Sequence, residues 1–307
     1  MARSAVNRYT SDGTNQDNFS YSDWGLLGAT SLIWGSSFLW IAIGLDAFHP
    51  GAIAFLRMAI GAAVLWLAPA ARTAVPRSEW KAIAVVTVAG NAAPAVLFPL
   101  AQQRIDSSVA GMINSISPIL VLAIAVLMTR RAPARMQLFG LSVGLIGAVL
   151  LALPNVSGAD AEPLGVGLVV LAVLGYASSN NFLPPLQQSY GGTAVIARAL
   201  TWSSVLLLPY GVYGIASSSF AWQSAAALTV LGVFGTGLAR AFFATLSGRV
   251  GAPRSSMVGY LVPVVAITLG VAVRGESVGA LELLGTGVVL LGAYLISRGR
   301  KVTKGRG

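Results

Sequence analysis

Long apolar segments follow one another along almost the whole sequence, with only short polar connections between them. A lipid bilayer has a hydrocarbon core of about 30 Å, which a helix of roughly 20 apolar residues can cross. The segments of about this length are residues 24–45, 51–70, 81–101, 108–128, 137–154, 164–185, 194–216, 225–247, 254–273 and 279–297. We therefore predict an all-α integral membrane protein with ten transmembrane helices.

The composition agrees with a membrane protein and argues against several other classes. Hydrophobic residues make up 55% and charged residues 10% of the 307 residues, and the mean hydropathy is +0.75. Soluble domains carry about 25% charged residues. The chain has no cysteine and one histidine, His49, so we expect no disulfide, metal site or cofactor. So few charges also argue against a nucleic-acid partner.

The positions of the basic residues indicate how the chain is oriented in the membrane. With the N-terminus in the cytoplasm, predicted inner segments carry fifteen Lys and Arg residues and outer segments carry only Arg104 and Arg274. Cytoplasmic loops of membrane proteins carry such an excess of Lys and Arg. We therefore expect both termini to lie in the cytoplasm. The lipid bilayer is an expected partner of the chain. Residues 1–23 are predicted to be a disordered cytoplasmic tail, and residues 298–307 a basic one.

The sequence contains an internal repeat. A shift of 145 residues aligns residues 104–151 with 249–296 without a gap. Three of the matches involve proline or glycine: Pro118 with Pro263, Gly140 with Gly285, and Gly147 with Gly292. We predict two five-helix repeats, residues 24–154 and 164–297, and since five is odd the second repeat must be inverted. Inverted repeats around a midplane site are typical of secondary transporters.

Polar and aromatic side chains inside the predicted helices are the candidate substrate-binding residues, because polar groups in hydrocarbon are costly. The candidates are Trp34, Ser37, Arg57, Asn91, Asn114, Tyr176, Asn180, Arg240 and Tyr260. The arginines can pair with a carboxylate or phosphate of a substrate, or they can snorkel or bind carbonyls of neighbouring helices. The serines can equally serve close helix packing. Pro94, Pro118 and Pro263 are expected to break helices and to act in gating.

Both halves of the sequence contain short motifs. Each motif alone identifies a family only weakly, but their order and spacing along the chain are more specific. They are Ile33-Trp34-Gly35-Ser36-Ser37-Phe38, Pro50 with Arg57, residues 107–118, Gly235-Thr236-Gly237-Leu238-Ala239, Gly251-Ala252, Pro263, Gly275-Glu276 and Gly285. Over residues 24–297 the chain thus resembles the drug/metabolite transporter superfamily, specifically its EamA-type ten-helix exporters. The resemblance implies a multi-pass protein of the bacterial plasma membrane that exports amino acids, other metabolites or toxic compounds.

Two residues depart from the family pattern, and both departures concern the substrate. Arg131 stands where the first half usually carries an acidic residue, equivalent to Glu276, and Arg240 stands where an aromatic residue is common.

The predicted function is secondary transport, by alternating access, of a small metabolite or a drug. We expect the metabolite to be an amino acid or a related carboxylate-bearing compound. The alternative is an organic-anion or phosphometabolite exchanger, which the intramembrane arginines without an acidic partner favour. A channel-like pore is the alternative from another class. We expect no enzyme, because paired carboxylates, Ser with Lys or His, and metal-ligand clusters are absent from the predicted helices. The substrate, the coupling ion and the oligomeric state stay open.

Overall fold

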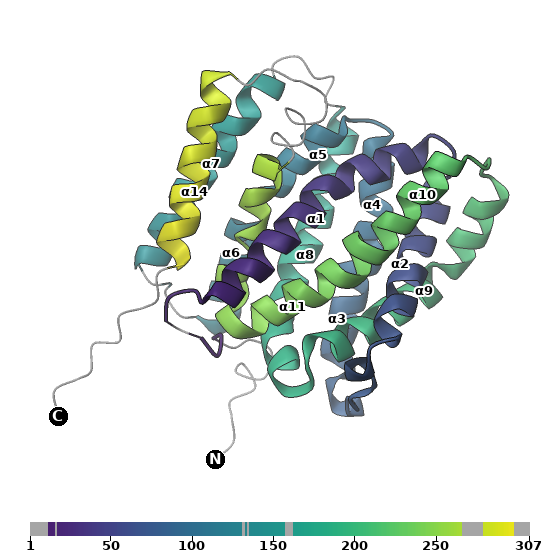
Figure 1. The fold of residues 1–307 in the computed structure, drawn as a ribbon, viewed down its shortest axis with the longest axis horizontal. Coiled ribbons are helices and arrows are strands. Elements are labelled where there is room, and N and C mark those ends of the chain that lie inside the picture. Colours follow the sequence, from purple (N-terminus) through teal and green to yellow (C-terminus); the bar gives the residue numbers. More distant parts are fainter. Residues whose placement is uncertain are drawn as a thin grey trace.

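The computed structural model describes residues 12–15, 17–130, 133, 135–156, 162–265 and 279–297. These residues form a bundle of helices joined by turns and short connections, and none of them is in a strand (Figure 1). Helices α7 (Arg135–Val156) and α14 (Ala280–Ser297) pack against each other at one end of the bundle, and the other helices form its main body (Figure 1).

The remaining elements follow in chain order. The first half contains α1 (Tyr21–Leu45), α2 (Pro50–Trp66), η2 (Pro69–Arg72), η3 (Arg77–Glu79), α3 (Trp80–Thr87), η4 (Val88–Ala92), α4 (Ala93–Gln102), α5 (Ser107–Asn114) and α6 (Ser117–Thr129). The second half contains α8 (Pro163–Tyr190), α9 (Gly192–Ala216), α10 (Trp222–Val230), η5 (Leu231–Leu238), α11 (Ala239–Val250), α12 (Ala252–Ser255) and a helical stretch over residues 258–265. Elements η4 and η5 are π-helices.

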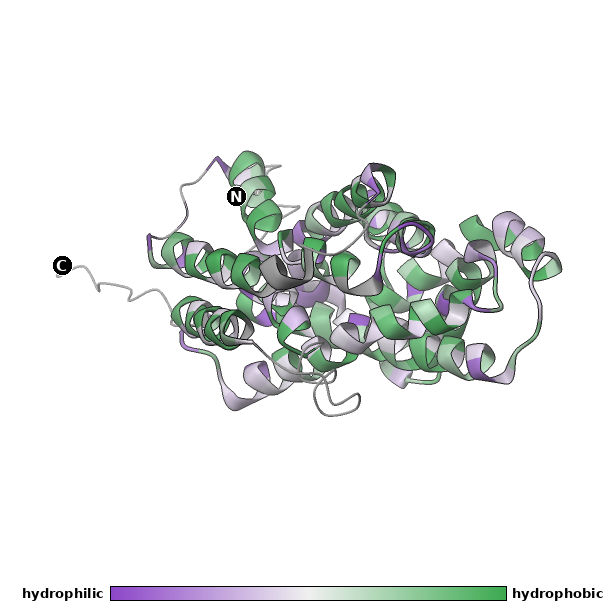
Figure 2. Cartoon of the chain, turned by 90° about the horizontal axis from the view of Figure 1, so that it is seen from above, coloured by the Kyte–Doolittle hydropathy of each residue, from purple (hydrophilic) through white to green (hydrophobic). Residues whose placement is uncertain are grey.

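Six helical segments of the described chain are long and apolar enough to cross a membrane. They are Tyr21–Leu45, Arg77–Gln102, Val109–Thr129, Pro163–Tyr190, Gly192–Ala216 and Trp222–Val250. Three further apolar helices are shorter: Pro50–Trp66, Arg135–Leu150 and Leu283–Ile296. Large apolar side chains such as Leu32, Leu127 and Leu171 are exposed on the helices, and much of the helical ribbon is coloured green for hydrophobic residues (Figure 2). The number of ten crossings and the side on which the termini lie stay predictions.

The structure differs from the predicted segments at specific interruptions. The segment 108–128 is broken at Ser115 and Ile116, where a turn separates α5 from α6. Helix α8 instead continues through Pro184 and Pro185 to Tyr190, since membrane helices tolerate proline where neighbouring groups satisfy the freed backbone atoms. The end of the predicted segment 254–273 and the basic tail lie outside the described residues.

The prediction of a disordered tail over residues 1–23 is wrong for the part that the structure describes. Asp23, fully buried near the start of α1, pairs with Arg249 Nε at 2.5 Å. It also accepts a hydrogen bond from Asn15 Nδ2 at 2.8 Å. Arg254 donates to the backbone oxygen of Asn15 at 3.0 Å. The polar composition of the tail concealed this order, because the partners lie more than 200 residues later in the chain.

We predict that Asp23→Asn lowers the free energy of unfolding by about 1–3 kcal/mol, because it leaves the guanidinium of Arg249 without its buried carboxylate. The matched control is Arg104→Gln, which removes the exposed pair between Arg104 and Glu162 at 2.6 Å. An exposed pair contributes about 0–1 kcal/mol. Thermal unfolding of the purified protein in detergent measures both, and equal effects of the two variants would contradict the ordered contact.

Glycines let α7 and α14 approach closely. A Cβ atom on Gly292 of α14 would lie 2.5 Å from the backbone nitrogen of Gly144 in α7, and one on Gly140 would lie 2.6 Å from Ile296 Cγ1. Small residues at such crossings allow membrane helices to gain van der Waals contact that lipid chains cannot match. The glycines that the internal repeat aligns therefore have a packing role at this helix pair.

The variant Gly292→Ala is expected to destabilise the protein, since its methyl group would meet the backbone of α7. Gly287→Ala on the same helix is the control, because nothing lies within 4 Å of a Cβ atom there. Alanine also has a higher intrinsic helix propensity than glycine, by about 1 kcal/mol. We expect the apparent melting temperature to fall for Gly292→Ala and to stay or rise for Gly287→Ala. A fall of the same size in both variants would speak against close packing of α7 and α14.

Candidate functional site

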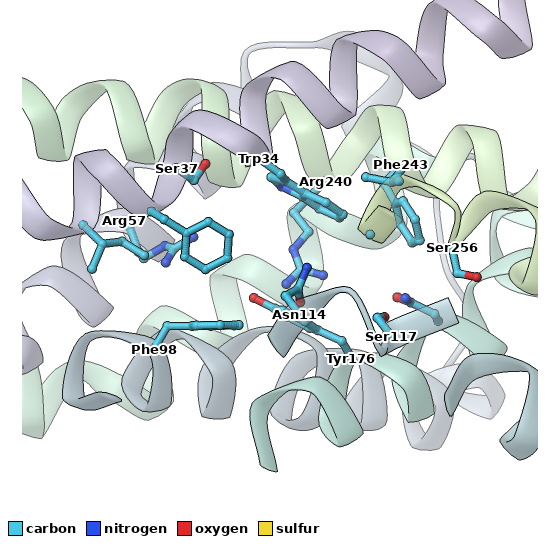
Figure 3. Close-up of a pocket in the computed structure, with 15 residues that line it drawn as sticks. Trp34, Ser37, Arg57, Phe98, Asn114, Ser117, Tyr176, Arg240, Phe243 and Ser256 are labelled. Carbon is cyan, nitrogen blue, oxygen red and sulfur yellow. The ribbon is translucent and has the colours of Figure 1, made fainter. Parts of the chain in front are cut away.

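A small cavity lies inside the main body of the bundle, between helices from both halves of the chain (Figure 3). Its volume is about 60 Å³, which is room for roughly four to six water molecules. The lining residues are Trp34, Ser37, Phe38, Ile41, Arg57, Phe98, Asn114, Ser117, Tyr176, Asn180, Arg240, Phe243, Ser256, Val258 and Gly259. The cavity combines two cationic side chains, several neutral polar groups and a set of aromatic rings.

Most of the candidate substrate-binding residues are brought together at this cavity. Seven of the nine line it: Trp34, Ser37, Arg57, Asn114, Tyr176, Asn180 and Arg240. The other two, Asn91 and Tyr260, are not among the lining residues. Their side chains instead satisfy backbone carbonyls, as described below.

The π-helix η5 positions two of the lining side chains. A π-helical turn disrupts the regular ladder of backbone hydrogen bonds and leaves carbonyl groups available to other partners. The carbonyl of Gly235 accepts a hydrogen bond from Trp34 Nε1 at 3.0 Å. One residue later, Thr236 Oγ1 accepts from Arg57 Nε at 3.0 Å. Helices α1 and α2 are thus both connected to η5 through side chains that face the cavity.

Arg240 is held between two aromatic rings. Its guanidinium carbon lies 5.4 Å from the ring centroid of Trp34 and 4.6 Å from that of Tyr176. Cation–π contacts of this kind are worth about 0.5–2 kcal/mol each, and most where water is excluded. Trp34 lies in the first predicted repeat and Tyr176 in the second. The two halves therefore each contribute a ring to one cation.

The break between α5 and α6 supplies polar groups to the opposite wall. Asn114 ends α5, and Ser117 begins α6 together with Pro118. Proline has no backbone N–H, so the carbonyl of Asn114 has no helical donor at that position. Asn180 of α8 also lines the cavity, and its Oδ1 atom is buried with no hydrogen-bond partner among the described residues. A buried amide oxygen without a partner is costly, so a ligand N–H or a water is its expected partner.

Three phenylalanines of the lining, Phe38, Phe98 and Phe243, were not among the candidate residues of the sequence analysis. Phe98 stacks on Tyr176 with ring centroids 5.7 Å apart, and Phe38 meets Phe98 edge-on at 5.5 Å. Phe243 packs against Trp34 at 5.1 Å. A phenylalanine in an apolar helix carries no signal in a single sequence that separates a cavity wall from a lipid-facing side. The nearest available signal is that Phe38 directly follows the serine motif of the first helix.

Asn91 and Tyr260 have structural contacts. Asn91 of η4, 1% exposed, donates from Nδ2 to the carbonyl of Val86 in α3 at 2.7 Å. Tyr260, fully buried, donates from its hydroxyl to the carbonyl of Leu141 in α7 at 2.9 Å. Its ring fills the space beside Gly144, where a Cβ atom would lie 2.6 Å from the ring.

The three prolines differ in what they do to the backbone. Pro118 follows the break between α5 and α6, in the first turn of α6. Pro94 lies in the first turn of α4, directly after the π-helix η4. The expected break at Pro263 is wrong, because helix continues through it to residue 265. The interruption in that segment lies earlier instead, at the turn formed by Ser256 and Met257. A role of these residues in gating stays a prediction.

The chemistry of the cavity favours a small anion. Arg57 and Arg240 are 7% and 6% exposed, and the described residues that line the cavity include no Asp or Glu. Among the described residues no group of three or more His, Cys, Asp or Glu side chains could hold a metal ion. Arginine presents a planar fork of N–H groups that suits carboxylates and phosphates. The neutral polar groups and the rings can then contact the rest of such a molecule.

A helical membrane bundle with a charged central cavity is the architecture of a membrane transporter. The model of the EamA-like transporter family matches residues 24–153 and 163–298, and the chain belongs to this family. It is similar to a probable terminal-alkyne amino-acid exporter of Streptantibioticus cattleyicolor, with 26% identity over 90% of this chain and 93% of the relative.

Two further comparisons concern location and fold. The chain is 25% identical to an uncharacterised inner membrane transporter, YedA, of Escherichia coli, over 90% of each chain. The family and this relative identify a multi-pass transport protein of the bacterial plasma membrane. A solved crystal structure has the same fold, with a TM-score of 0.71 and 16% identity over 90% of this chain and 96% of the other.

A mutation can distinguish a structural role of Tyr260 from a role in transport. We predict that Tyr260→Phe lowers the free energy of unfolding by about 1–2 kcal/mol, because the buried carbonyl of Leu141 loses its donor. Transport of a substrate is expected to stay within about twofold of the wild type, because the residue does not line the cavity. Thermal unfolding and flux in proteoliposomes measure the two effects. A large loss of flux with unchanged stability would place Tyr260 in the transport path instead.

Proposed function

We propose that this protein exports a small carboxylate-bearing metabolite, such as an amino acid, or a drug with an anionic group. The observation that carries this proposal is the cavity between the two halves, in which Arg57 and Arg240 are buried without a carboxylate partner among the lining residues. The name of the exporter in Streptantibioticus cattleyicolor points to the same class of substrate. The metabolite would bind at the cavity and leave on the opposite side of the membrane by alternating access.

We also propose the predicted topology: ten crossings, two inverted five-helix repeats and both termini in the cytoplasm. The family model matches the chain twice, over residues 24–153 and 163–298. Each half also carries a π-helix in its third predicted segment: η4 (Val88–Ala92) lies in segment 81–101 and η5 (Leu231–Leu238) in segment 225–247. The ion pair of Arg104 with Glu162 and that of Arg249 with Asp23 each join segments that this topology puts on one side.

Alternating access follows from such an arrangement. Two related halves of opposite orientation can exchange their conformations, so the inward-open and outward-open states have similar energies. In this chain, α1 and α2 contact η5, and α8 contacts α4 and α6. The cavity is therefore enclosed by helices of both halves, and a relative movement of the halves would open it to one side or the other.

An exchanger is the second candidate. The two arginines have no compensating acid in the lining, so an empty cavity that closes would enclose uncompensated charge, which is costly at low dielectric. A bound anion removes this cost. Exchange of one anion for another would then be faster than net export, and counterflow of labelled substrate in proteoliposomes distinguishes the two modes.

The experiment that tests the proposed function is a thermal-shift screen of the purified protein against amino acids, organic anions, phosphometabolites and cationic drugs. Compounds that stabilise the protein are then followed by flux in proteoliposomes. Stabilisation by anionic compounds together with saturable counterflow is expected. Stabilisation by cations alone would contradict the role of the arginines, and single-channel currents would favour a pore.

We predict that Arg240→Gln lowers the rate of transport at least about tenfold, because a charge-assisted contact to the substrate is worth roughly 1.5–3 kcal/mol. The control is Ser178→Ala on α8, whose exposed hydroxyl bonds only its own helix, at the carbonyl of Leu174. Initial rates in proteoliposomes and size-exclusion profiles report on transport and folding. A folded Arg240→Gln variant with the wild-type rate would exclude this residue from the substrate site.

A further inference from the structure

The cavity contains two positive charges, and none of the described residues that line it carries a compensating carboxylate. Arg57 comes from α2 and Arg240 from α11, and both are more than nine-tenths buried. The ion pairs in the described part of the chain use Arg104 and Arg249 instead. Resting on the function proposed above, we propose that the ligand of this cavity carries two anionic groups, one for each arginine.

One singly charged group cannot compensate both arginines, and each guanidinium is held by its own contacts. Arg57 is tied through Nε to Thr236. Arg240 is held between the rings of Trp34 and Tyr176. Figure 3 shows the two guanidinium groups at different places in the cavity, with that of Arg240 toward Tyr176 and Asn114. A single carboxylate supplies one negative charge against these two positive charges, so one positive charge stays uncompensated wherever the carboxylate binds.

The energetic difference between one and two anionic groups is large in such a place. Removing a guanidinium from water carries a desolvation penalty that an opposite charge at contact distance offsets. For a ligand with one carboxylate, this penalty stays uncompensated at the second arginine. A second carboxylate or a phosphate compensates it and adds charge-assisted hydrogen bonds.

The rest of the lining limits what can lie between the two anionic groups. The cavity volume of about 60 Å³ allows only a short molecule. Phe38, Phe98 and Phe243 provide apolar walls for a carbon chain. The unpartnered Oδ1 atom of Asn180 can accept a hydrogen bond from an ammonium group. Short dicarboxylates and phosphorylated carboxylates fit, and acidic amino acids satisfy Asn180 as well.

The test compares ligands that differ in one anionic group but have nearly the same shape. Purified full-length protein is titrated at pH 7.5 with four pairs: L-glutamate and L-glutamine, L-aspartate and L-asparagine, succinate and succinamate, and O-phospho-L-serine and L-serine. Isothermal titration calorimetry measures each affinity. We expect the first member to bind at least about tenfold more tightly in one pair or more, corresponding to about 1.4 kcal/mol.

The outcomes separate this inference from the function on which it rests. Binding of the ligands with a ratio below tenfold in every pair would overturn the inference and leave the proposed export of a carboxylate-bearing metabolite intact. If no ligand of the four pairs and no amino acid or organic anion of the thermal-shift screen binds, both fail. The phosphoserine pair and the dicarboxylate pairs show which kind of second anionic group the cavity takes.

Variants assign the two charges to the two arginines. Arg57→Gln and Arg240→Gln are each expected to bring the affinity ratio within a pair to about threefold or less, while Ser178→Ala keeps the wild-type ratio. Arg57→Lys and Arg240→Lys retain the charge and are expected to keep a preference for the first member, so the Lys variants report if the Gln variants do not fold. A wild-type ratio in both Gln variants would overturn the assignment.

Discussion

The requirement to satisfy every backbone polar group inside a bilayer shapes both the fold and the site. Regular helices meet it internally, so any irregular turn needs partners from elsewhere in the protein. In η5, Gly235 finds its partner in Trp34, while the carbonyl of Val86 next to η4 is bonded by Asn91. The turn at Ser115 brings polar groups to the cavity. The π-helix η5 and the turn at Ser115 thus contribute to the cavity. At η4, the side chain of Asn91 bonds the backbone carbonyl instead.

A related requirement explains why aromatic rings lie against Arg240 and a hydroxyl lies against Arg57. In a bilayer an arginine needs partners that replace its water, and a ring face or a hydroxyl can supply part of them without adding negative charge. Trp34 and Tyr176 do so for Arg240, and Thr236 does so for Arg57. A carboxylate in these positions would neutralise the cation and remove its attraction for an anion. Rings and hydroxyls keep the charge available.

Much of this organisation could be predicted from the sequence, because long apolar segments and rare polar residues within them are strong signals in a membrane protein. Seven of nine candidate residues line one cavity for this reason. The sequence did not show that Asn91 lies outside the lining of the cavity. An amide that donates to a carbonyl five residues earlier looks the same in sequence as an amide that faces a cavity. Nothing in the sequence indicated that the ring of Phe98 lines the cavity. The ordered contacts around Asp23 depend on Arg249, a partner far along the chain that local composition does not reveal.

The charge of the cavity also bears on how a transporter of the proposed kind would cycle. In an open state, water can solvate Arg57 and Arg240, so an empty site is tolerated. Alternating access requires a closed state between the two open ones, and closure removes that water. The energy of closure then depends on the ligand, because an anion replaces the lost solvation and an empty site lacks a replacement. The two arginines would thus bind the substrate and also favour closure when the substrate is present, which joins recognition and conformational change in the same two side chains.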